Sequence, residues 1–265
     1  MTLAGTIENI FALKSLSIVA LLFIPLERLL PLRRTQKVLR KGWKNDLIYL
    51  VLNSALMNVA VAIGALVLLQ LKSRFLPVEI ASEIHQPVWL QVIELILIID
   101  LLHYAVHRLY HTVPFLWRFH ALHHSIEELD WLATVRVHPV DQAPTAIAML
   151  LPILLLGWSP FAVVIWSVVY RWHAFLQHAN IRLPLGRVGL VVVGPEFHRW
   201  HHSTSPAARD KNFAAQFALW DVIFGTCYLP SNIASDEYGI DEELPTAYVD
   251  QLCHPLRGLA QKSAS

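Results

Sequence analysis

The sequence predicts an all-α, integral-membrane helical bundle with a cytoplasmic helical cap that carries a histidine-rich dinuclear metal site. Three observations support this fold class. Hydrophobic residues make up 55% of the 265 residues and charged residues only 15%, against about 25% charged residues in an average soluble domain. Long uncharged stretches recur along the chain. Twelve of the 14 histidines lie between His103 and His202.

We expect a single membrane domain over residues 1–265, because no linker, repeat or low-complexity segment divides the chain. The net charge is +1, which gives no reason to expect a polyanionic partner, so no nucleic acid is expected. The lipid bilayer is the first partner that the composition indicates.

Three stretches are expected to cross the bilayer in the first part of the chain, the last of them running into the first histidine pair. Residues 47–71 form 25 consecutive uncharged positions, more than the roughly 20 that a spanning helix needs. Residues 7–30 are also expected to span, although Lys14 and Glu27 interrupt them; a lysine near a helix end can reach the interface. Residues 88–107 contain two acidic residues before the first histidines, and ionisable groups at membrane depth usually mark a site.

Basic residues predict the orientation of these spans. The loop between the first two spans carries seven of them, against two in the following loop. The positive-inside rule therefore places the first loop in the cytoplasm, and two crossings later the histidines are cytoplasmic as well. The seven are Arg28, Arg33, Arg34, Lys37, Arg40, Lys41 and Lys44.

A bent hairpin is expected over residues 142–178, entering the bilayer and returning to the cytoplasmic side. Residues 142–170 are uncharged over 29 positions, but a proline and a Gly-Trp-Ser-Pro turn signal interrupt them. As one straight helix they would reach about 43 Å, short of the roughly 60 Å that two full crossings need. A single crossing would separate the histidines before it from those after it, and a single tilted span remains the alternative.

The histidines fall into groups with helical spacing. His103 and His107 are four residues apart, and Asp100 and His111 share roughly their face. Two HxxHH triplets follow, each able to aim several ring nitrogens at one point. The triplets are His120, His123 and His124, and His198, His201 and His202. Eight nitrogens exceed what one ion can use while leaving room for substrate, so two metal ions are expected; neutral imidazole suits iron, zinc and copper.

Other polar residues near the boxes have open roles. His138 and His178 could supply two further nitrogens. Asp100, Asp141 and Glu196 could orient ring nitrogens as hydrogen-bond acceptors, or could equally be helix-end or surface charges. The boxes contain no carboxylate, unlike the glutamate-rich di-iron sites of soluble four-helix bundles.

These residues resemble a known family. The order HxxxH, HxxHH, a middle histidine and a second HxxHH is similar to that of the fatty acid hydroxylase and sterol desaturase superfamily of membrane di-iron enzymes. The resemblance covers about residues 95–230. It is carried by residues 123–125, 133–139, 177–180, 197–203 and 220–226.

The resemblance implies a ligand set. His178 resembles the family's middle ligand, and His138 the histidine of an Arg-x-His-Pro motif. The full implied set is His103, His107, His120, His123, His124, His138, His178, His198, His201 and His202. His173 lies five residues before His178 rather than four, so its role is open, and His85 and His254 are expected to be ordinary polar residues. Residues 220–226 are interpreted as a structural turn beneath the site.

The resemblance also implies the chemistry. Two iron ions, for which zinc can substitute, and dioxygen would attack a C–H bond of a lipid, either fatty acyl or sterol-like. Hydroxylation is expected, and desaturation by the same site is the alternative. Two electrons would come from a separate donor protein, because the sequence contains no GxGxxG, CxxCH or iron–sulfur cysteine set. The basic loop could dock that donor, although topology and contact with anionic lipids are the favoured explanation.

Two other classes of protein remain as alternatives. A zinc-dependent membrane hydrolase could use the same imidazoles, but no HExxH motif supplies its usual glutamate base. A metal-binding transporter would need polar groups along a transmembrane route, whereas these histidines are expected to cluster at one face.

Overall fold

The computed structural model describes residues 13–75, 86–231, 235 and 237–262, and the regular elements within them are all helical. The all-α prediction is therefore confirmed. The α-helices are α2 (Leu13–Leu29), α3 (Trp43–Ile48), α4 (Ser54–Phe75), α5 (Val88–Thr112), α6 (Pro114–His124), α7 (Pro139–Leu156), α8 (Pro160–His178), α9 (Pro195–His201), α10 (Leu219–Ile223) and α11 (Tyr248–Lys262). A π-helical turn, Tyr49–Asn53, joins α3 to α4, and 3-10 turns lie at Trp131–Val135 and Gly186–Leu190.

Three helical segments among the described residues are long and apolar enough to cross a membrane. They are Trp43–Phe75, Val88–Thr112 and Pro139–Leu156. Large apolar side chains along the first of them remain exposed, for example Ile63 and Leu66, as expected of a surface that faces lipid. The chain is therefore a membrane protein. The first part of the expected span 7–30 lies outside the described residues, and its remainder forms α2.

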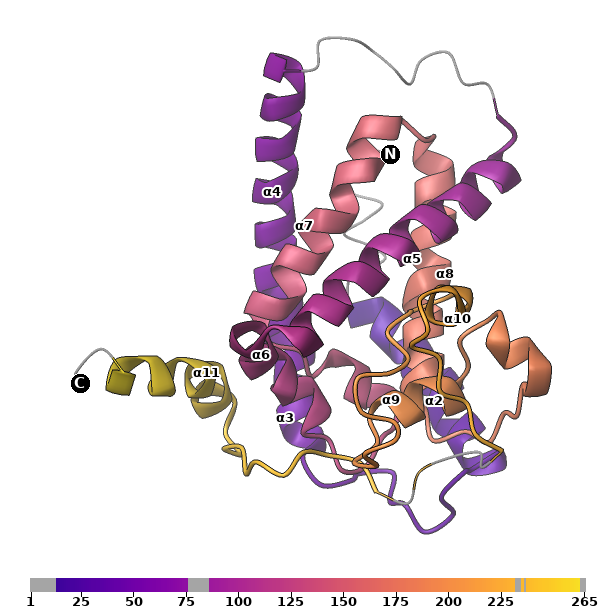
Figure 1. Ribbon diagram of the computed structural model, residues 1–265, viewed down its shortest axis with the longest axis vertical. Helices are drawn as coiled ribbons and strands as arrows, with labels where there is room; N and C mark the ends of the chain where they lie inside the picture. Colours follow the sequence, from indigo (N-terminus) through magenta and orange to yellow (C-terminus); the bar gives the residue numbers. More distant parts are fainter. Residues whose placement is uncertain (1–12, 76–85, 232–234, 236, 263–265) are drawn as a thin grey trace.

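The long helices α4, α5, α7 and α8 form one end of the molecule, and α6, α9 and α10 gather with the loops at the other (Figure 1). Helix α5 contacts both α7 and α8, and α4 packs along α7. The close approach of α4 to α7 depends on Gly64, because a Cβ there would lie 2.7 Å from Ile147.

The segment in which the hairpin is expected contains α7 and α8, which run in opposite directions (Figure 1). Helix α7 ends at Gly157, whose φ of 68° lies in the left-handed region that glycine adopts without strain. Helix α8 then begins with Ser159 as its N-cap, which accepts a hydrogen bond from the backbone N–H of Ala162 at 3.2 Å. The capping residues at this turn therefore make the chain reverse its direction. The end of α8 returns to the end of the molecule that α6, α9 and α10 form (Figure 1), which is called the cap below.

Candidate metal centre

Among the described residues, nine histidines bring their ring nitrogens together in two adjacent groups. Within each group one nitrogen per residue lies within 4.8 Å of all the others. Site A consists of His107, His111, His120, His124 and His201, and site B of His123, His178, His198 and His202. The two sites touch, because the rings of His124 and His202 stack with their centroids 4.5 Å apart.

Each HxxHH triplet divides its side chains between the two sites. In α6 the i,i+4 pair His120 and His124 belongs to site A, while His123 belongs to site B. In and just after α9 the assignment is reversed, with two residues in site B and His201 in site A. Successive helix residues are about 100° apart around the axis, so the adjacent histidines of a triplet must point in different directions. The motif thus suits two neighbouring ions.

The spacing of the nitrogens fits bound metal. Imidazole nitrogens about 2.1 Å from one ion lie roughly 3.0 Å apart at a right angle. In site A the Nε2 atom of His120 lies 3.0 Å from that of His107 and 3.2 Å from that of His124. The buried Nε2 atoms of His111 and His201 have no hydrogen-bond partner among the described residues, a costly arrangement that an ion would relieve.

Site B has the same spacing. The Nε2 atom of His178 lies 3.2 Å from that of His123 and 2.9 Å from that of His198. A further 3.1 Å separates the Nε2 atoms of His198 and His202. Both sets of residues therefore fit a metal ion.

Hydrogen bonds to the opposite ring nitrogens orient the rings of site A. The Nδ1 atom of His107 lies 2.8 Å from the carbonyl oxygen of Phe213, and that of His201 lies 2.8 Å from the carbonyl oxygen of Lys211. The Nδ1 atom of His120 lies 2.8 Å from a carboxylate oxygen of Asp141. An Nδ1–H that donates to such an acceptor leaves the Nε2 lone pair free for metal.

In site B, the acceptors that orient the rings are both backbone carbonyls. The Nδ1 atom of His123 lies 3.1 Å from the carbonyl oxygen of Arg136, and that of His178 lies 2.9 Å from the carbonyl oxygen of Ala174. The buried Nδ1 atoms of His198 and His202 have no partner within the described part of the chain. The rings of site B are thus held by fewer acceptors, neither of which is charged.

Burial favours the neutral, metal-binding form of these rings. It lowers the pKa of His201 to about 3. The pKa values of His124 and His202 lie well below the usual value, first because burial penalises the charged form and then because neighbouring histidines disfavour a second positive charge. The cap is therefore set up for neutral imidazole at physiological pH.

Two buried aspartates hold the loop that orients His107. Asp100 accepts three backbone N–H groups, from Ala215, Gln216 and Phe217, at 2.7–2.9 Å. Asp221 accepts the N–H groups of Phe213 and Ala214, both at 2.8 Å.

Of the three carboxylates considered from the sequence, only Asp141 contacts a histidine ring nitrogen within the described part of the chain. Asp100 holds the loop at 215–217, and Glu196 accepts a backbone hydrogen bond from Leu185. Residues 220–226 contribute the loop-holding Asp221, a structural role.

Eight of the ten sequence-predicted ligands lie in the two sites, and two do not. His103 hydrogen-bonds through Nδ1 to the hydroxyl of Tyr170 at 3.3 Å. His138 is the N-cap of α7: its Nδ1 accepts from the N–H of Val140 at 3.0 Å, and its Nε2 lies 3.1 Å from the carbonyl oxygen of Leu252. Both of its nitrogens are therefore engaged.

The structure adds His111, which the sequence pattern indicates only as sharing a helix face with His103 and His107. His103, His107 and His111 are each four residues apart, so the HxxxH motif that binds metal can be either His103 with His107 or His107 with His111. Helix α5 ends at Thr112 and α6 starts at Pro114, so the histidines nearest this turn face α6. His103 lies about 6 Å beyond His107 along the helix axis, on the side away from this turn. The position of the turn between α5 and α6 is therefore the signal that distinguishes the two possible histidine pairs.

The remaining histidines lie elsewhere. His173 reaches the carbonyl oxygen of Val193 at 2.6 Å and belongs to neither site. His254 pairs with Glu242 at 2.9 Å on the surface, and His85 lies outside the described residues.

Comparison with known proteins gives consistent matches. Residues 92–226 match the family described as fatty acid hydroxylase. The ornithine lipid hydroxylase OlsE of Rhizobium tropici is 30% identical over 262 residues, which cover 96% of this chain and 77% of that protein. Human alkylglycerol monooxygenase is 33% identical over 48% of this chain and 28% of its own length. Human cholesterol 25-hydroxylase is 30% identical over 49% and 48%. No solved structure matches this chain.

Proposed function

This chain belongs to the fatty acid hydroxylase family, and from that premise we propose that it is a di-iron enzyme that hydroxylates a C–H bond of a membrane lipid with dioxygen. The chain is an oxidoreductase of the lipid-hydroxylase type, as its relatives are named hydroxylases and monooxygenases. The observation that carries the proposal is the convergence of nine histidine rings on two adjacent sites.

The proposed substrate is a polar membrane lipid, with an ornithine lipid as the first candidate. The relative that aligns over nearly the whole of this chain is named an ornithine lipid hydroxylase. The sterol and alkylglycerol enzymes align over about half of it. The apolar helices α5 and α7 contact α6, and α8 contacts α9, so the proposed site for the lipid tail lies where the apolar helices meet the metal centre.

In this proposal the residues of the chain have distinct roles. When bound, two redox-active ions would supply the activation of dioxygen that attack on a C–H bond requires. The nine imidazoles hold the ions, Asp141 and the backbone carbonyls orient the imidazoles, and buried aromatic rings such as Phe213 exclude water. Zinc can occupy the same nitrogens but cannot change its oxidation state.

We further propose that the protein is multi-pass with its metal centre on the cytoplasmic side, where a separate protein delivers two electrons. The seven basic residues between Arg28 and Lys44 support this orientation. The segment that carries them runs from the end of α2 to α3 and lies at the same end of the molecule as α6 and α9 (Figure 1). An acidic donor would meet this loop beside the centre.

Comparative lipidomics tests the proposal. The chain is expressed in a host that makes the candidate lipid, alongside the His201→Ala variant, which removes a ligand of site A. A lipid that gains one oxygen atom only with the unaltered chain is expected. Loss of two hydrogens would identify a desaturase, and an unchanged lipidome with iron-loaded protein would contradict the proposal.

A further inference from the structure

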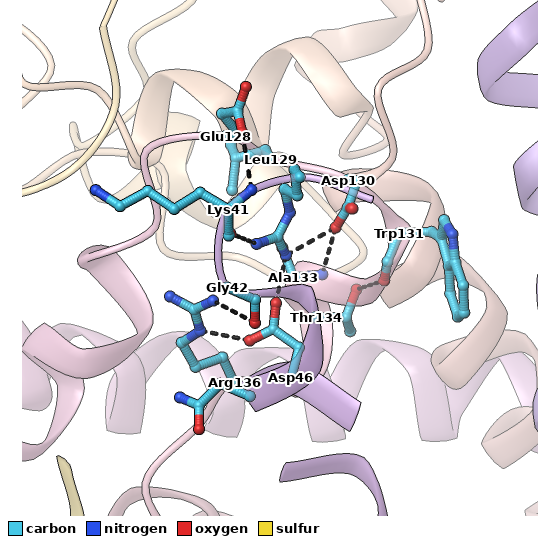
Figure 2. Close-up of polar contacts among 12 residues, drawn as sticks. Lys41, Gly42, Asp46, Glu128, Leu129, Asp130, Trp131, Ala133, Thr134 and Arg136 are labelled. Carbon is cyan, nitrogen blue, oxygen red and sulfur yellow. Dashed lines mark hydrogen bonds and ion pairs between the residues drawn. The ribbon is translucent and has the colours of Figure 1, made fainter. Parts of the chain in front are cut away.

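A network of buried charges joins α3 and the loop before it to the segment before α7 (Figure 2). Asp46 accepts hydrogen bonds from Arg40 at 2.6 Å and from Nε of Arg136 at 2.5 Å. Arg40 also pairs with Asp130 at 2.8 Å. Two guanidinium groups and two carboxylates thus form a neutral set.

These charges are fully inside the protein. The side chains of Arg40 and Asp46 are 1% and 0% exposed, and that of Arg136 is 9% exposed. Buried ion pairs often stabilise a fold no better than apolar residues of the same volume. Stability of the fold alone therefore gives little reason for this network. Its effect on the residues that it positions is the other possible role.

The backbone is shaped to admit the guanidinium of Arg136. Gly42, just before α3, has a φ of 85°, and a Cβ at this position would lie 2.5 Å from Nη2 of Arg136. The carbonyl oxygen of Gly42 accepts a hydrogen bond from the same nitrogen at 3.5 Å. Both the conformation and the absence of a side chain at Gly42 thus hold Arg136 in place.

The network holds both ends of a short segment that reaches site B. Asp130 begins it, capping the turn Trp131–Val135 through the N–H of Ala133 at 2.9 Å. Arg136 follows the turn, and its carbonyl oxygen lies 3.1 Å from Nδ1 of His123. The other nitrogen of that ring is one of the four that converge in site B. A shift of Arg136 would therefore turn the ring.

We propose that Asp46 and Arg136 are positioning residues for His123, and that their ion pair sets the metal affinity of site B. Site A does not depend on them, since its His120 is oriented by the carboxylate of Asp141. In site B the acceptor for His123 is the uncharged carbonyl oxygen of Arg136, so residues outside the site have to hold this carbonyl in place. The inference rests on the proposed function only in requiring that site B binds metal.

Cobalt(II) titration of the purified, metal-free full-length chain tests this inference, with visible absorption and metal content as readouts. For the unaltered chain, two cobalt ions are expected per molecule. In Asp46→Asn, one of them is expected to bind up to about 10-fold more weakly, because the carbonyl of Arg136 remains but is held less firmly, whereas loss of a ligand's direct partner costs about 10- to 100-fold. Its absorption bands should shift, while those of the other ion should not.

Three variants complete the test. Lys41→Gln is the matched control, because it removes an exposed ion pair to Glu127 at 3.6 Å from the same loop; unchanged binding is expected. Arg136→Lys keeps the positive charge and should lose less affinity than Arg136→Gln. If Asp46→Asn cannot be purified, the comparison of Arg136→Lys with Arg136→Gln tests the inference.

Two results would overturn the inference. One is unchanged affinity and absorption for both ions in Asp46→Asn or, where that variant is missing, equal behaviour of Arg136→Lys and Arg136→Gln. The other is an equal weakening of both ions, which would make the network a general support of the fold. Failure of the proposed function would look different, because the unaltered chain would bind two ions and still leave lipids unhydroxylated.

Discussion

The carboxylate of Asp141, in the first turn of α7, lies 2.8 Å from Nδ1 of His120 in α6. Both side chains are buried. This is the contact through which a spanning helix orients a ring of site A. Since an anionic acceptor strengthens the donor ability of the imidazole toward metal, the pair makes a direct prediction.

Asp141→Asn should weaken metal binding at site A by about 10- to 100-fold and leave site B unchanged, because the amide keeps the shape but not the charge. Metal titration of the purified protein measures this. Asp210→Asn is the control: Asp210 contacts His111 at 3.3 Å but is 55% exposed, so water screens it, and asparagine tolerates its positive φ. Equal losses in the two variants would contradict the assignment.

His111→Ala should abolish activity and remove metal from site A, whereas His103→Ala should retain two ions per chain. The reason is that the nitrogen of His111 converges with four others while His103 is hydrogen-bonded to Tyr170. Metal content by mass spectrometry gives the answer. Should His103→Ala lose as much metal as His111→Ala, the register of α5 in the site would be wrong.

His138→Asn should keep both metal ions and nearly all stability, because asparagine is a strong N-cap. His138→Ala should also keep both ions but lower the free energy of unfolding by about 1 kcal/mol, since the N–H of Val140 loses its acceptor. Thermal unfolding and metal content are measured together. A loss of metal in His138→Asn would show that the ring is a ligand after all.

Cys253, exposed on α11, reports the orientation. A membrane-impermeant maleimide should label it in inside-out vesicles and leave it unlabelled in right-side-out ones, because the cap is proposed to face the cytoplasm. Cys253→Ser provides the background from the less exposed Cys227. Labelling from the outer side alone would reverse the proposed orientation.

Much of the site was predictable because the triplet spacing is a local property of a helix. His120, His123 and His124 could be recognised from sequence, as could the fold class from the uncharged stretches. Two features were not predictable from local pattern. The choice between His103 and His111 depended on where α5 ends, and the role of Asp100 depended on a loop 115 residues further along the chain.

The ion pair between Asp46 and Arg136 was likewise outside the reach of sequence periodicity, because 90 residues separate its partners. Asp46 also lies at the start of an apolar segment, where a charge is ordinarily interpreted as an interfacial residue. Tertiary contact gives it another role. The basic loop that predicted the topology proves to contain one buried member, Arg40, among otherwise accessible charges.

Anomalous diffraction at the iron edge, from crystals of the iron-loaded protein, tests the central claim most directly. Two peaks are expected, one among the rings of His107, His111, His120, His124 and His201, and the other among those of His123, His178, His198 and His202. A single peak, or peaks away from these rings, would contradict the dinuclear histidine site on which the proposed chemistry depends.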